Sequence, residues 1–260
     1  MAEAALQIEP VGMRSLRVLA RLLDYPTPEL QEAAGDMIEV LGAERRWPTA
    51  LRTELMAWCQ RIAEADLLDL QATYVAQFDK GRATSLLLFE HVHGESRDRG
   101  QAMVDLLAEY EAAGFELDAR ELPDYLPLFL EYLSTRSEAE IGRWLGEIRH
   151  ILALLTARLE ERDAEHARVP LALLALFGAE TDVDGHRAKV REEERDDTPQ
   201  ALDAVWEEEA VRFSAASDQD CALQSAEGRR LAERKRATQG EAVRILEPTG
   251  SAQNINGDLS

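Results

Sequence analysis

Residues 137–159, SEAEIGRWLGEIRHILALLTARL, decide the fold class. Ser137 and Glu140 have the spacing of a capping box, which predicts the start of a helix. The apolar residues that follow recur with a period near 3.6, which is typical of an amphipathic α-helix. This sustained stripe consists of Ile141, Trp144, Leu145, Ile148, Ile151, Leu152, Leu155 and Leu159.

Similar helical spacing precedes this stretch. Thr27 and Pro28 predict an N-cap and a first helical position, and Trp47 with Pro48 opens another helix. No alternating strand pattern with hairpin turns occurs in the sequence. We therefore predict an all-α fold, a single multi-helix, bundle-like domain of roughly eight to ten helices. Its other apolar stripes are Leu16, Leu19, Leu22 and Leu23; Leu55, Trp58 and Ile62; and Leu67, Leu70, Tyr74 and Phe78.

Composition limits the possible functions. The 260 residues include 50 Asp and Glu against 29 Lys and Arg, which gives a net charge of −21. This charge argues against nucleic acid as a partner, because phosphate binding requires a cationic surface. The two cysteines, Cys59 and Cys221, lack the spacing of a zinc site or a disulfide framework.

Nothing in the sequence indicates a membrane segment or a secretory signal. The N-terminus lacks the basic and long apolar regions of a signal peptide, and the longest apolar stretch, 169–179, is too short to cross a bilayer. We expect a soluble, cytoplasmic protein that does not insert into a membrane.

The composition changes near Gly178. We predict a helical domain over 1–177 and an acidic, mostly disordered tail over 178–260, because the tail is too polar to offset the entropy of ordering. One exception lies near 201–214, where a short amphipathic element is expected to dock on the domain or on a partner. The alternative is a solvated tail with incidental apolar residues. The apolar residues concerned are Leu202, Val205, Trp206, Val211 and Phe213.

Residues 85–100, SLLLFEHVHGESRDRG, carry chemically versatile side chains. Glu90, His91, His93 and Glu95 suggest a metal site, but residues two apart on a helix point to different sides. No HExxH motif is present. The alternative, a helix end near Gly94 at which the histidines bond to free carbonyl groups, is the stronger interpretation. We predict no metal site and no catalytic residues.

Residues 118–133, DARELPDYLPLFLEYL, contain two prolines four apart. Pro123 and Pro127 predict either a bent or interrupted helix, with Asp124 and Tyr125 beside an apolar stripe, or simply the start of a helix. The residues alone leave both alternatives open.

Residues 74–133 closely resemble the nitrate reductase molybdenum cofactor assembly chaperones, the NarJ-type branch of the TorD/DmsD-like redox-enzyme maturation proteins. Residues 19–30, LARLLDYPTPEL, match the same family, and the tail's WEEEAVRF resembles the family's acidic C-terminal element. Sister branches have an Asp-His pair where this sequence has Asp124 and Tyr125. The tyrosine favours the nitrate branch and does not support carrying over a role for that histidine.

This resemblance implies an all-helical, non-enzymatic chaperone. Its partner would be the N-terminal peptide of the apo catalytic subunit of respiratory nitrate reductase. It would support insertion of the molybdenum cofactor, and by extension the iron–sulfur cluster, without binding a cofactor permanently. Molybdenum cofactor biosynthesis proteins are further candidate partners. The alternatives are a chaperone for another molybdoenzyme and, less favoured, an all-α metal-dependent enzyme that uses His91 and His93.

The resemblance also implies candidate residues. The structural motif residues are Gly94, Gly100, Pro123 and Pro127. The candidates for client-peptide binding are Tyr74, Phe78, Asp79, Glu90, His91, His93, Arg97, Met103, Asp124, Tyr125, Leu126 and Glu131.

Overall fold

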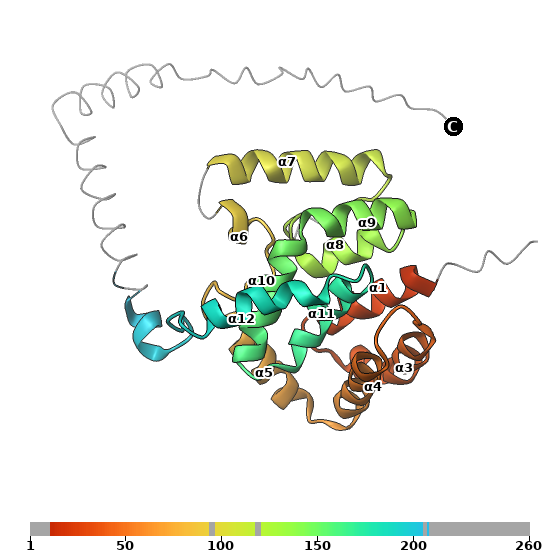
Figure 1. The fold of residues 1–260 in the computed structure, drawn as a ribbon, viewed down its shortest axis with the longest axis horizontal. Helices are drawn as coiled ribbons and strands as arrows, with labels where there is room; N and C mark the ends of the chain where they lie inside the picture. Colours follow the sequence, from red (N-terminus) through yellow and green to blue (C-terminus); the bar gives the residue numbers. More distant parts are fainter. Residues whose placement is uncertain (1–10, 94–96, 118–120, 205–206, 208–260) are drawn as a thin grey trace, which may run out of the picture. The chain divides into compact units, whose positions relative to one another are not determined.

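The structure is a computed structural model that describes residues 11–93, 97–117, 121–204 and 207 (Figure 1). The chain divides into two units, Met1–Leu202 and Asp203–Ser260. Almost all described residues belong to the first unit, which contains every helix and cavity named below.

The first part of this unit consists of α1 (Val11–Leu22), α2 (Pro28–Glu32), α3 (Ala34–Ala43), α4 (Thr49–Glu64) and α5 (Leu67–Phe78). Thr27 is the N-cap residue of α2 and Pro28 follows it, as predicted. Helix α3 packs against α4 and α1. The apolar stripes of these helices meet in one core, in which Leu16, Leu41 and Leu55 are fully buried.

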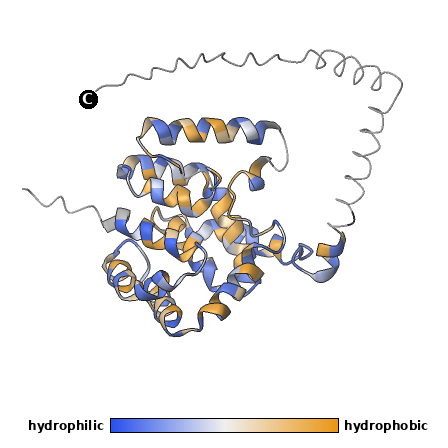
Figure 2. Cartoon of the chain, turned by 180° about the vertical axis from the view of Figure 1, so that it is seen from behind, coloured by the Kyte–Doolittle hydropathy of each residue, from blue (hydrophilic) through white to orange (hydrophobic). Residues whose placement is uncertain are grey.

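The second part begins with α6 (Glu90–His93), α7 (Arg97–Ala112), α8 (Leu126–Leu133), α9 (Glu138–Glu147) and α10 (Arg149–Glu161). It continues with η1 (Glu165–Ala167), α11 (Arg168–Ala175), η2 (Glu180–Val183) and α12 (Asp184–Val190). Helix α8 packs against α1, and α10 packs against α11 and α12. In Figure 2 orange and blue residues alternate along most helices, which is the pattern of amphipathic helices that share a core.

The all-α prediction is confirmed for the described residues, where the only β pairing is an isolated antiparallel bridge between Leu87 and Tyr125. Up to residue 177 they form eleven α-helices, more than the eight to ten predicted for this part of the chain, and α12 follows. The difference arises because short helices such as α2 and α6 contain too few residues to show a full apolar period.

The stripe that decides the fold class belongs to two helices. The capping box of Ser137 and Glu140 is present at the start of α9. The helix ends at Glu147. Its C-cap residue Ile148 departs from helical geometry, with φ −93° and ψ 5°, and α10 begins at Arg149. Gly142 and Gly146 lower the helix propensity before this point. The apolar period continues across the break, so both helices face the core.

Gly178, the predicted boundary, is a turn inside the first unit. Its φ of 67° lies in the left-handed region, as is common after the last turn of a helix. Beyond it, Val183 and Val190 are buried in the core. The division predicted between 1–177 and 178–260 therefore falls earlier than the structural one, which follows Leu202. Most of the element predicted near 201–214 lies outside the described residues.

Two further features are the environment of Cys59 and the polarity of the helices. Cys59 is a free, fully buried thiol on α4, and burial raises its pKa to about 12. Within the described part of the chain, the helices are all too short or too polar to cross a membrane.

Candidate functional site

Residues 86–89 and 124–126 are joined side by side. The amide of Leu88 donates to the carbonyl of Asp124 at 3.0 Å, and the amide of Leu126 donates to the carbonyl of Leu86 at 2.8 Å. The two prolines explain why this segment is not helical. Pro127 lies in the first turn of α8, and Tyr125 before it is extended, with φ −68° and ψ 117°. Pro127 therefore marks a helix start, as the second alternative has it, whereas Pro123 lies in the turn before α8.

Asp124 is the fully buried polar residue of this junction. Its Oδ2 accepts a hydrogen bond from the amide of Phe89 at 3.0 Å and lies 4.0 Å from Nη2 of Arg99. Among the described residues its Oδ1 has no hydrogen-bond partner. Burial raises the pKa of this carboxyl group, and the Phe89 amide and the Arg99 charge partly offset that increase.

Arg99, from α7, links this junction to α6. Its Nη1 lies 3.3 Å from Oε1 of Glu90 and its side chain is 19% exposed. The family resemblance points to Arg97 and not to Arg99, although both lie in GESRDRG. Positions two apart on a helix face different directions, and the contact of Arg99 with Asp124 becomes visible only in the fold.

His91 is held by the preceding loop. Its Nε2 lies 2.8 Å from the carbonyl oxygen of Ser85, so this nitrogen is the donor and is not available as a metal ligand. Burial lowers the pKa of His91, which favours the neutral ring. Within the described residues there is no group of His, Cys, Asp and Glu that would hold a metal ion. The side chain of His93, together with Gly94, Glu95 and Ser96, is outside them.

Tyr74 joins the aromatic part of the site. Its hydroxyl lies 3.1 Å from that of Tyr125 and 3.3 Å from the carbonyl of Leu23, and burial raises its pKa to about 12. The Phe78 ring packs between Tyr74 and His166, with centroids 4.8 and 4.9 Å away. His166, which no sequence motif indicates, is buried, and its Nδ1 has no hydrogen-bond partner among the described residues.

The remaining predicted residues are dispersed. Asp79 is exposed at the end of α5, Met103 is half-buried on α7, and Glu131 forms a 3.3 Å ion pair with Arg21. Leu126 is fully buried in the core. Gly100 lies in α7 with open space around it, and the side chain of Arg97 is outside the described residues. The structure thus groups Tyr74, Phe78, Glu90, His91, Asp124 and Tyr125 around one buried junction, mostly in packing roles.

Two cavities adjoin this junction. The first, termed here the acidic cavity, has a volume of about 650 Å³ and is lined by Leu107, Glu111, Gly114, Glu116, Leu117, Glu121 and Pro123. Among the residues that the structure describes, its lining contains three carboxylates and no basic side chain. The second, the arginine cavity, has a volume of about 630 Å³ and is lined by Arg82, Ala83, Glu90, His91, Arg99, Leu154, Arg158, Glu193, Glu194 and Asp196.

Comparison with known proteins places this chain in a family. The family model described as nitrate reductase delta subunit matches residues 44–169. The nitrate reductase molybdenum cofactor assembly chaperone NarJ of Escherichia coli K12 is 50% identical over 209 residues, which cover 80% of this chain and 88% of NarJ. NarW of the same strain, named as a probable chaperone of this kind, is 50% identical over 201 residues, or 77% and 84% of the two chains. The probable chaperone NarJ of Bacillus subtilis strain 168 is 33% identical over 178 residues, which cover 64% of this chain and 91% of that protein.

These relatives are named as assembly chaperones and not as enzymes, so the class of protein is that of assembly chaperones. The chain belongs to the family of nitrate reductase molybdenum cofactor assembly chaperones.

Proposed function

We propose that this protein binds the N-terminal peptide of the apo catalytic subunit of respiratory nitrate reductase. It holds that subunit in the cytoplasm while the molybdenum cofactor and the iron–sulfur cluster are inserted, before membrane assembly. The observation that carries this proposal is the 50% identity to NarJ over 80% of the chain. The cofactor is cargo delivered to the client, with help from its biosynthesis proteins, and is not a permanent ligand of this chain.

The acidic cavity is our candidate for the peptide site. Leu107 and Glu111 line it from α7, and Val104, 60% exposed, precedes them at helical spacing on the same face. Leu122, next to Pro123, is 44% exposed. An amphipathic client helix would place its apolar face on these leucine and valine side chains.

Charge supports the same choice. Glu111, Glu116 and Glu121 surround the cavity, and the whole chain carries a net charge of −21. Carboxylates at the rim attract a basic peptide and increase its association rate. Contacts of this kind weaken with salt, which suits a chaperone that must release its client.

Calorimetry with the full-length protein and a synthetic peptide of the client N-terminus tests both proposals. The double variant Glu111→Lys, Glu116→Lys is expected to weaken binding by roughly 5- to 30-fold, on the order of 1–2 kcal/mol. The control Glu32→Lys, Glu39→Lys changes net charge equally on exposed positions of α2 and α3 and should bind as the wild type does.

The possible outcomes test peptide binding separately from the acidic cavity as the binding site. If the wild type shows no saturable binding, the proposed function is wrong. If the wild type binds and the two double variants bind equally well, the function stands and the acidic cavity is not the site. A competing peptide from another molybdoenzyme should not displace the nitrate reductase peptide at equal concentration.

A further inference from the structure

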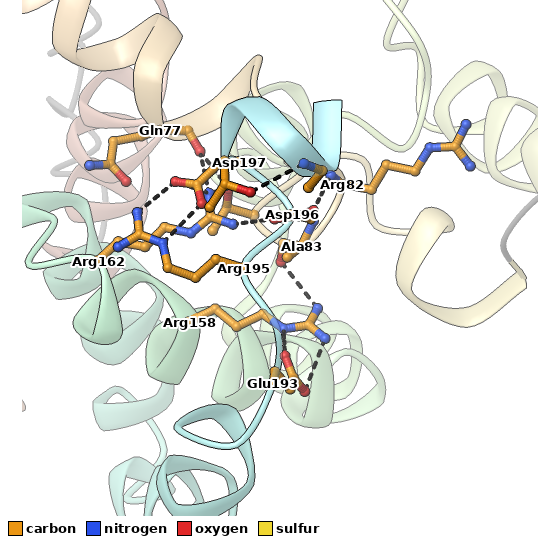
Figure 3. A network of polar contacts seen from close by, with 12 residues as sticks. Gln77, Arg82, Ala83, Arg158, Arg162, Glu193, Arg195, Asp196 and Asp197 are labelled. Atoms are coloured by element: carbon orange, nitrogen blue, oxygen red, sulfur yellow. Dashed lines mark hydrogen bonds and ion pairs between the residues drawn. The ribbon is translucent and has the colours of Figure 1, made fainter. Parts of the chain in front are cut away.

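An acidic segment lies against the arginine cavity. Residues 193–197, EERDD, follow α12 and are termed here the acidic strap. Two arginines of α10, one turn apart, hold it (Figure 3). Arg158 Nε lies 2.9 Å from Glu193 and Arg162 Nη2 lies 2.6 Å from Asp196.

Asp196 occupies an anion site made by the chain itself. Its Oδ2 accepts hydrogen bonds from two consecutive backbone amides, those of Arg82 at 2.6 Å and Ala83 at 2.7 Å. Gly81 makes this approach possible, because its φ is +84° and a Cβ there would lie 2.5 Å from the Asp196 carboxylate. Arg162, whose side chain is only 5% exposed, contacts the other oxygen. Consecutive amides with a buried guanidinium group are the donors that proteins use to bind phosphate.

Most of the described carboxylates that line the cavity beside this anion site come from the strap. The lining contains three arginines and four carboxylates, and three of those carboxylates, Glu193, Glu194 and Asp196, come from the strap. The other charged residues in the described part of the lining are three arginines and Glu90. The Nε of Arg99 is buried and has no hydrogen-bond partner among the described residues. A donor for an anionic ligand is therefore still available there.

The strap, EERDD, contains no apolar residue, and its hydrogen bonds and ion pairs hold it in place. Val190 is the last buried residue before it, and residues 191–195 are exposed. The Asp196 side chain is one third exposed. A segment without apolar anchors can leave its position without opening the core, and its ion pairs weaken with salt.

We propose that the arginine cavity is a binding site for a phosphoryl group, and that the acidic strap occupies it as an internal competitor. A phosphoryl oxygen replaces the Asp196 carboxylate at the amides of Arg82 and Ala83 and at Arg162. The remaining oxygens face Arg99 and Arg158, and the strap moves out. The cavity volume of about 630 Å³ leaves room for an organic group attached to the phosphate. This site goes beyond client-peptide binding and does not depend on it.

The test is a titration of inorganic pyrophosphate into the full-length protein by calorimetry. The variant Glu193→Gln, Asp196→Asn removes two strap charges while it keeps side-chain size, and it is expected to bind pyrophosphate at least 10-fold more tightly than the wild type. The control Glu32→Gln, Glu39→Gln removes the same charge elsewhere and should bind as the wild type does. A parallel titration with ADP distinguishes an esterified diphosphate from the free ion.

Hydrogen exchange provides a second measurement. The amides of Arg82 and Ala83 should exchange faster in the strap variant than in the wild type, and pyrophosphate should restore their protection. The proposal is overturned if the strap variant binds neither pyrophosphate nor ADP more tightly than the wild type does. It is also overturned if bound ligand leaves these two amides unprotected.

Discussion

Replacing Asp124 by alanine tests the junction that organises the candidate site. The change removes the acceptor of the Phe89 amide, at 3.0 Å, and a partner of Arg99, while the side chain it replaces is fully buried. A hydrogen bond to a charged group contributes about 1.5–3 kcal/mol. Desolvation of the carboxylate already offsets part of that contribution, as its raised pKa indicates. We therefore expect a loss of about 2 kcal/mol in the free energy of unfolding, measured by urea denaturation near neutral pH.

Asp124→Asn is the matched control. Asparagine keeps an oxygen that accepts from the Phe89 amide. Its loss in the free energy of unfolding should therefore be less than half that of alanine. The pH dependence adds a second check. Because the folded pKa of Asp124 is raised, the charged form opposes folding, and the wild type should gain stability relative to Asp124→Asn as pH falls through the folded pKa toward 3.8. If alanine costs less than about 0.5 kcal/mol, or as little as asparagine, the carboxylate does not hold the junction.

Three further experiments test the burial of His166, the cap of α9 and the burial of Cys59. His166 has a folded pKa of about 4 because of burial, against 6.5 when unfolded, so the unfolded chain takes up a proton first as pH falls. The wild type should lose about 2 kcal/mol more stability between pH 7 and pH 5 than His166→Gln does, and parallel denaturation curves would contradict this. Ser137→Ala removes the capping box of α9 and should cost about 1 kcal/mol by the same assay, whereas Glu140→Gln should cost less. Cys59, with its pKa raised to about 12, should resist iodoacetamide in the folded protein and react after denaturation, as peptide mass spectrometry would show.

Local sequence rules predict the helices well. The helical period predicts the core positions of α4, α5, α9 and α10, and the caps at Thr27 and Ser137 are where the sequence places them. The break at Ile148 is not predictable from the period, because the apolar stripe continues through it into the next helix. Gly178 suggests a boundary because the composition changes there. The buried Val183 and Val190 show that a few apolar residues suffice to keep a polar segment on the core.

The candidate site is only partly predictable from the sequence, because burial and contacts between distant residues depend on the fold. Tyr74, Phe78, Asp124 and Tyr125 lie near one another in the structure, but spacing cannot show that they are buried or half-buried rather than on the surface. Arg99 contacts Asp124, which lies 25 positions away in the chain. The acidic strap contacts Arg82 through Asp196, which lies 114 positions away. Contacts over such separations are set by packing and have no local signal.

Binding of the nitrate reductase N-terminal peptide to the purified full-length protein tests the central claim most directly. We predict saturable binding in calorimetry that weakens as salt rises and that falls roughly 5- to 30-fold in Glu111→Lys, Glu116→Lys. Absence of saturable binding to the wild type, with the protein shown to be folded by circular dichroism, would contradict it.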